Sequence, residues 1–237
     1  MTIIGRRIKA PGSGKSIWCS TEAGHPSGEY RDMTEDMARI IRDKYTRLTQ
    51  SKYEKLIRHL PDLYSLGLRP KTAVGEFLME IADTIRRYIR FQQVVVSLLD
   101  PKDRLYKFVV VQGHTPETTR EYKSLTYTAD DLFDRSNYPS VQLSNRTFFY
   151  MGEHHPYIPG EEKFFYRPSK MGQKRDSPDK MLWDDYICCY FYDLLKKPLG
   201  WIEVANKIDN KLPEKEDIVF LEFFASMVEV FVNRPGK

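Results

Sequence analysis

Two short stretches of the chain carry residue types that bind phosphates or metals in other proteins. The first, Pro11-Gly-Ser-Gly-Lys-Ser16, resembles the end of a loop that holds phosphate groups with backbone N–H groups. Such a loop has a glycine where this chain has Lys9, and it leads into a helix, whereas Ser16 is followed by Gly24 and Pro26. We therefore expect no nucleotide site there.

The second stretch, Glu153-His154-His155, offers ligands for a metal ion. A zinc site needs a third and usually a fourth ligand at defined spacing, and none accompanies these histidines. We interpret them as solvated loop residues and expect no metal.

The three cysteines of the chain are Cys19, Cys188 and Cys189. They cannot build a disulfide framework, and no Cys-x-x-Cys pair occurs. This usage is typical of a reducing compartment, so a cytoplasmic protein is expected. Because neighbouring side chains of a strand point to opposite faces, Cys188 and Cys189 are also expected to point apart. The residues alone identify no catalytic group.

Hydrophobic periodicity predicts the elements that position these residues. Apolar side chains at helical spacing predict helices over 32–68, 72–89 and 214–233. Runs rich in β-branched and aromatic residues predict strands over 93–99, 105–111, 186–192 and 199–205. A further short strand is expected near 147–150 within an otherwise irregular region.

This order of elements predicts an α+β fold with an antiparallel sheet of five or six strands and helices packed on it. We expect a flexible N-terminal arm over 1–31 and a helical extension over 32–68. A single domain is expected over 70–235, with an irregular insertion at about 125–182.

Composition also bears on the kinds of partner the protein binds. The chain has 237 residues and a net charge of only +4, with basic and acidic residues interspersed, so no nucleic-acid partner is expected. No stretch approaches the run of about 18 apolar residues that a membrane helix needs, so no membrane association is expected.

The end of the chain carries a recognisable pattern. A strand, Gly200-Trp-Ile-Glu-Val-Ala-Asn206-Lys207, is followed by Leu212-Pro213, an acidic pair at Glu216-Asp217 and an apolar helix over 218–232. This pattern resembles that of GAF domains, the sensory and regulatory modules of phosphodiesterases, phytochromes and histidine kinases. The resemblance is good over 199–232, fair over 72–113 and poor over 125–180. Leu212 replaces the phenylalanine of the phosphodiesterase version, and the two acids are exchanged.

The resemblance implies a structural role for Asn206, Lys207, Glu216 and Asp217. Physically, the first turn of a helix favours carboxylates, and Lys207 leaves the strand shortly before that turn. An ion pair between Lys207 and one of these acids would fasten the strand to the helix.

The resemblance also implies a pocket between the sheet and residues 111–185. The cyclic-nucleotide binders of the family have an aromatic residue and an acid before a glycine where this chain has Val111-Gln112-Gly113, which disfavours a cyclic purine. No cysteine for a bilin lies in the irregular region. The candidate pocket residues are Gln112, His114, Phe148, Tyr150, Trp183 and Tyr186.

We expect a stand-alone GAF-like sensor that binds a small molecule of unknown identity, without an assigned cofactor. It would signal as a homodimer or through a partner protein. One alternative is a scaffold or dimerisation module whose pocket is filled by side chains such as Phe148 or Trp183. A third, suggested by family members that reduce free methionine sulfoxide, would need Cys188 or Cys189 at the pocket floor.

Overall fold

The computed structural model describes residues 36–40, 51–133, 136–158, 160–161 and 168–234. The chain divides into one unit over 1–48 and a compact unit over 49–237. In the first unit, residues 36–40 are helical. The predicted arm over 1–31 and most of the predicted extension before residue 51 lie outside the described residues.

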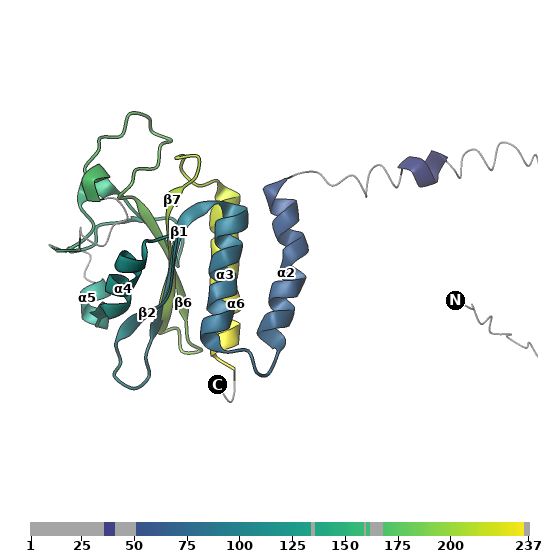
Figure 1. The fold of residues 1–237 in the computed structure, drawn as a ribbon, viewed down its shortest axis with the longest axis horizontal. Helices are drawn as coiled ribbons and strands as arrows, with labels where there is room; N and C mark the ends of the chain where they lie inside the picture. Colours follow the sequence, from purple (N-terminus) through teal and green to yellow (C-terminus); the bar gives the residue numbers. More distant parts are fainter. Residues whose placement is uncertain (1–35, 41–50, 134–135, 159, 162–167, 235–237) are drawn as a thin grey trace, which may run out of the picture. The chain divides into compact units, whose positions relative to one another are not determined.

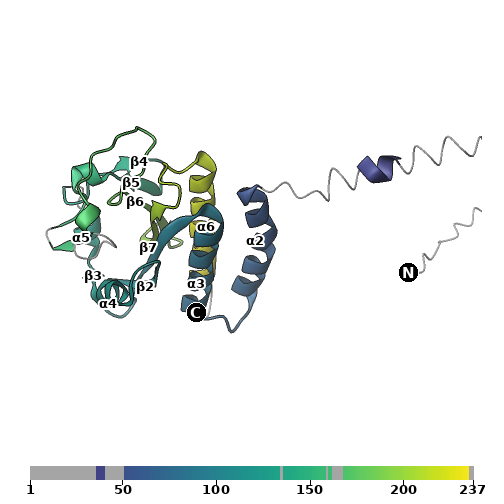
Figure 2. The same cartoon turned by 45° about the horizontal axis from the view of Figure 1, so that its top comes forward.

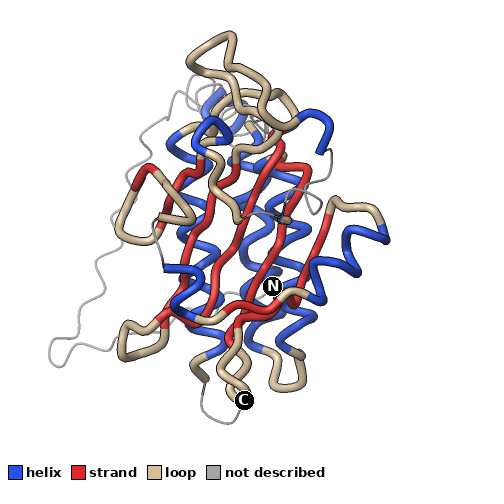
Figure 3. Tube along the Cα trace, turned by 90° about the vertical axis from the view of Figure 1, so that its left-hand side faces the viewer, coloured by secondary structure: helices blue, strands red, loops and turns tan. Residues whose placement is uncertain are grey.

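An antiparallel sheet of seven strands forms the centre of the larger unit, in the order β3-β2-β1-β7-β6-β5-β4 (Figure 3). The predicted α+β fold is confirmed, although the sheet is larger than expected. The difference comes from strands of two residues, which are too short to leave an alternating pattern in the sequence. The strands are β1 (Phe91–Leu99), β2 (Tyr106–Gln112), β3 (Thr126–Tyr127), β4 (Val141–Gln142), β5 (Thr147–Tyr150), β6 (Tyr186–Tyr192) and β7 (Pro198–Lys207).

Helices cover both faces of the sheet (Figures 1 and 2). On one face lie α3 and α6, with α2 packed against both of them. On the other face lie the shorter α4 and α5 (Figure 2). The helices are α2 (Lys52–Leu68), α3 (Val74–Thr84), α4 (Pro116–Ser124), α5 (Ala129–Phe133) and α6 (Lys215–Val232), with a π-helical turn (Ile85–Ile89) and 3-10 turns (Gly152–His154, Pro168–Lys170).

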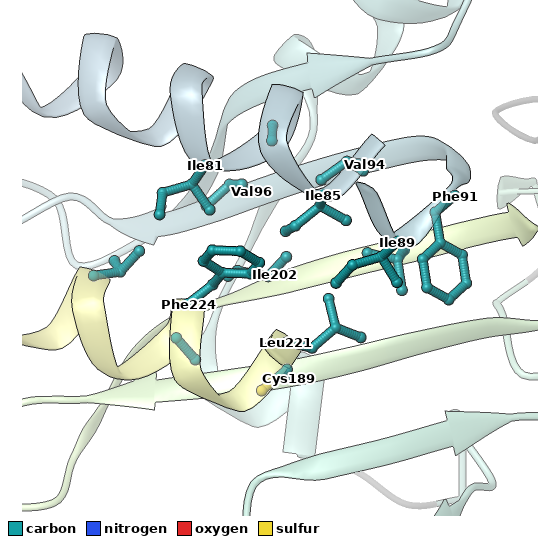
Figure 4. Close-up of a cluster of buried hydrophobic side chains, with 14 of the residues drawn as sticks. Ile81, Ile85, Ile89, Phe91, Val94, Val96, Cys189, Ile202, Leu221 and Phe224 are labelled. Atoms are coloured by element: carbon teal, nitrogen blue, oxygen red, sulfur yellow. The ribbon is translucent and has the colours of Figure 1, made fainter. Parts of the chain in front are cut away.

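The face covered by α3 and α6 holds the larger hydrophobic core. Ile81 and Ile85 meet Phe224 of α6 over Ile202 of β7, and all four side chains are almost completely buried (Figure 4). Burial of each such side chain stabilises the fold by about 1.5–3 kcal/mol. This core explains the apolar stripes of the predicted helices.

The opposite face of the sheet carries an aromatic layer. It contains Tyr106, Phe108, Tyr150, Tyr186, Tyr190 and Trp201. The two layers follow from the alternation of side chains along each strand. In β7, for example, Ile202 and Val204 belong to the large core, whereas Trp201 belongs to the aromatic layer.

The same alternation places Glu203 on the aromatic side of the sheet. In the register of the sheet, Glu203 lies opposite Val95 of β1 on one side and Cys188 of β6 on the other. A carboxylate in the middle of a central strand is costly to bury without partners. The position of Glu203 therefore suggests a role for its carboxylate other than stabilising the fold.

Candidate ligand-binding site

A cavity of about 80 Å³ lies between the aromatic face of the sheet and the segments that cover it. The sheet contributes Tyr127, Trp201 and Glu203, and the covering segments contribute Glu161. An adjoining pocket of about 200 Å³ is also lined by Ser140, Phe148 and Tyr192. It shares four lining residues with the cavity: Leu132, Tyr138, Tyr150 and Tyr190.

The carboxylate of Glu161 is held by several hydrogen bonds. The hydroxyl groups of Tyr127 and Tyr138 donate to its Oε1 at 2.7 and 3.0 Å, and the backbone N–H of Ile158 donates to its Oε2 at 3.0 Å. These bonds join β3, at one edge of the sheet, to the loop that follows β5. The hydroxyl hydrogens of Tyr127 and Tyr138 are therefore bonded to Glu161 and do not point into the cavity as free donors.

The carboxylate of Glu203 has much weaker partners. The Trp201 indole N–H donates to its Oε2 at 3.4 Å, and the Cys188 thiol lies 4.0 Å from the same oxygen. Both distances exceed those of ordinary hydrogen bonds, which are near 2.9 Å for N–H donors. Burial raises the pKa of Glu203 to about 7, and the nearby Glu161 adds to that increase.

Comparison with solved structures identifies the fold that carries this cavity. A GAF domain/HD domain protein from Geobacter sulfurreducens superposes with a TM-score of 0.50, at 11% identity, over 69% of this chain and 95% of that chain. The chain has a GAF-like fold. At this level of identity the likeness concerns the fold alone.

Two further solved structures are similar to the GAF-like chain. The GAF domain of an Acinetobacter phosphoenolpyruvate-protein phosphotransferase matches at 12% identity over 78% of this chain and 94% of that chain, with a TM-score of 0.49. The phytochrome photosensory core module of Stigmatella aurantiaca matches at 14% identity over 76% of this chain and 36% of that chain, with a TM-score of 0.47. No family model and no curated protein matches the sequence.

The GAF-like fold brings three of the six candidate pocket residues to the cavity region. Tyr150 and Tyr186 line the cavity, where their rings stack with centroids 4.4 Å apart. Phe148 lines the adjoining pocket. The Tyr186 hydroxyl donates to the backbone carbonyl of Pro156 at 2.7 Å, so this ring is fixed from the covering loop.

The other three candidates line neither space. Gln112 accepts a hydrogen bond from Arg86 at 3.1 Å, and Trp183 packs under the ammonium group of Lys170, 4.6 Å from the ring centroid. Neither ring nitrogen of His114 has a hydrogen-bond partner within the described residues. Burial, with the nearby Arg86, lowers the pKa of His114 to about 4, so the ring is neutral near pH 7.

The residues of the GAF-like end pattern form a fastening between β7 and α6. The Lys207 ammonium is buried, 2.9 Å from an oxygen of Asp209 and 3.7 Å from Oδ2 of Asp217. Asn206 is buried and donates to the Gln93 side chain. Glu216 is exposed, so the two adjacent acids occupy different environments.

Asp217 also fastens α6 to α2. Its Oδ1 accepts from the Lys52 ammonium at 2.9 Å and from the Tyr53 hydroxyl at 3.1 Å, and its Oδ2 accepts from the Glu214 N–H at 3.0 Å. We define Lys52, Tyr53, Lys207 and Asp217 as the clasp. It joins two helices and the central strand around one buried carboxylate.

The two strand cysteines lie on opposite faces of the sheet, as alternation requires. Cys188 lines the cavity, whereas Cys189 belongs to the large core. Burial raises the pKa of both thiols, that of Cys189 to about 12. A thiolate is the reactive form, and this arrangement favours neither a thiolate nor an internal dithiol.

The described part of the chain contains no group of three or more His, Cys, Asp or Glu side chains that could hold a metal ion. Among the same residues, no helix has the length and apolar character to span a membrane.

Sequence reasoning missed Glu161 and Glu203 as cavity residues. The signal for Glu203 was present, because an acid stands in the middle of an otherwise apolar and aromatic strand. For Glu161 the signal was absent, because its segment has no regular pattern.

Proposed function

We propose that this chain is a GAF-like sensory or regulatory module that binds a small molecule in the cavity over the aromatic face of the sheet. The observation that supports this function most is a cavity bordered by carboxylates and tyrosines and not filled by Phe148 or Trp183. A ligand-free scaffold would be favoured by a space that these side chains fill. The structures with similar folds include a photosensory module and a GAF domain/HD domain protein.

Ligand binding would be tested by thermal unfolding of the full chain against nucleotides, amino acids, organic acids and amines. A ligand at one hundred times its Kd stabilises the folded state by about 2.7 kcal/mol, so true ligands raise the melting temperature measurably. Each compound that does so would be tested again on Cys188→Phe, which places a larger side chain at the cavity wall.

The matched control is Leu195→Phe, which adds the same ring at an exposed turn position, 77% accessible to solvent. We expect the ligand-induced shift to be lost in Cys188→Phe and kept in Leu195→Phe. A shift that survives in both variants would place binding outside the cavity. If every compound leaves the wild-type melting temperature unchanged, the scaffold interpretation is favoured.

We further propose that the module signals through its helices, as a homodimer or with a partner protein. Three apolar side chains on α6, Val219, Phe223 and Val230, are exposed at 54%, 44% and 61%, and their spacing places them along one side of the helix. Helix pairs commonly associate through such stripes. Sedimentation of the full chain at several concentrations measures whether it self-associates, and a monomer at all concentrations favours a partner of another sequence.

A further inference from the structure

The charges around the cavity restrict what can bind there. Glu203 and Glu161 border it from the sheet and from the covering loop, respectively. Among the described residues that line it, there is no Lys, Arg or His. An anionic ligand would therefore be buried beside carboxylates, with no cation among the described lining residues to neutralise it, which is strongly unfavourable.

The remaining wall is largely aromatic. Phe108 and Trp201 join the tyrosines of the sheet and of the covering segments. The faces of aromatic rings carry partial negative charge and attract cations, most strongly where water is excluded. Aromatic rings beside a carboxylate are thus the environment in which proteins hold ammonium groups.

The hydrogen bonds of the cavity wall also favour a cationic ligand. The hydroxyl hydrogens of Tyr127 and Tyr138 are directed to Glu161, and that of Tyr186 is directed to the carbonyl of Pro156. These tyrosines therefore present ring faces and oxygen lone pairs to the cavity more readily than donor hydrogens. A ligand with N–H donors or a positive charge fits this wall better than a ligand that needs donors from the protein.

Glu203 is the carboxylate with unused acceptor capacity. Glu161 accepts three hydrogen bonds of 3.0 Å or less, whereas Glu203 has only the long contacts to Trp201 and Cys188 among the described residues. A cation beside Glu203 would supply both the missing hydrogen-bond donors and the missing positive charge.

We propose that the cavity binds a small organic cation, with an ammonium or guanidinium head beside Glu203 and the aromatic rings. This inference rests on the proposed ligand-binding function and specifies the chemical class of the ligand. A short apolar tail would extend past Tyr138 and Tyr150 into the adjoining pocket, because both residues line the two spaces.

The experiment compares ligands of the same shape and different charge on the wild-type chain. Choline and its neutral analogue 3,3-dimethylbutan-1-ol form one pair, and butylammonium and butan-1-ol form another, with butylguanidinium and butyrate completing the series. Titration calorimetry would measure each affinity. We expect at least one cation to bind about tenfold or more tightly than its neutral analogue, and butyrate not to bind.

The variant Glu203→Gln keeps the size of the side chain and removes its charge. We expect it to lower the affinity for the bound cation by about tenfold or more and to leave the affinity for the neutral analogue unchanged. The matched control, Glu216→Gln, removes one charge from the exposed surface of α6 and should change neither affinity. Circular dichroism would confirm that both variants are folded.

The outcomes separate this inference from the function on which it rests. If a neutral or anionic compound binds in the cavity and none of the cations does, the cation proposal is wrong and the sensory function stands. If no compound of this series binds, the cation proposal is contradicted, and the sensory function is contradicted as well only if no compound of the thermal-unfolding screen binds either. Equal affinity of a cation for wild type and Glu203→Gln would also overturn the assignment to Glu203.

Discussion

Replacing Asp217 with alanine is expected to lower the free energy of unfolding by about 3–5 kcal/mol, because the substitution breaks the clasp around a buried carboxylate. Asp217 is completely buried and accepts hydrogen bonds from Lys52, Tyr53 and the backbone of Glu214. Without it, the buried Lys207 ammonium keeps only Asp209 as an acidic partner among the described residues. Urea unfolding followed by circular dichroism measures the change.

The control for this prediction is the residue next to Asp217 in the sequence. Glu216→Ala removes an acid from the same helical turn, but Glu216 is exposed, so we expect a change of less than about 0.5 kcal/mol. Equal losses in the two variants would show that the charge of the first turn matters and that the clasp does not.

Glu203→Gln is expected to make the ligand-free protein more stable by about 2 kcal/mol at about pH 8 and to leave its stability nearly unchanged at about pH 4. The cause is the folded-state pKa of Glu203, which is raised from 4.5 to about 7 by burial and by Glu161. The Glu203 side chain keeps some exposure to solvent, so screening reduces the full effect of this shift, which would be about 3 kcal/mol.

The sign follows from the protons bound in each state. Between pH 4.5 and about 7, Glu203 has lost its proton in the unfolded chain and keeps it in the folded chain. The unfolded state then binds fewer protons, so stability falls as pH rises through this range. Glutamine does not titrate, so the stability of the variant does not fall in this pH range for this reason.

Urea unfolding of both proteins across this pH range measures the difference. The other groups near Glu203, namely Glu161, Cys188 and the tyrosines of the wall, are present in both proteins, so their direct contributions largely cancel. Glu216→Gln serves as the control and should follow the wild type at each pH. A difference between wild type and Glu203→Gln that is the same at both ends of the range would contradict the raised pKa.

The regular elements were predictable because they obey simple periods. The strand over 186–192 was predicted with the bounds that β6 has, and α6 begins within a residue of the predicted start. The two-residue strands β3 and β4 were not predictable, because two residues are too few to show an alternating pattern. The same limit applies to the segments that cover the aromatic face.

The site was predictable only in part. Tyr150 and Tyr186 were among the predicted pocket residues, and both line the cavity. Gln112 and His114 were predicted because they flank Gly113. In the structure Gln112 is the last residue of β2 and His114 follows two positions later, and both lie beside Arg86 and outside the cavity lining. Alternation shows which side chains share a face, but it does not reveal which part of that face remains uncovered.

Trp201 gives the cavity an optical reporter of its own. Its indole ring is 97% shielded from solvent, lies in the cavity wall and contacts the Glu203 carboxylate through its N–H group. Indole emission depends on local charge and polarity, so ionisation or neutralisation of Glu203 changes the electric field at the fluorophore. The chain has only three tryptophans, and Trp183 lies under Lys170, outside the cavity lining. Occupancy of the cavity is therefore readable in the intrinsic fluorescence spectrum, without any added label.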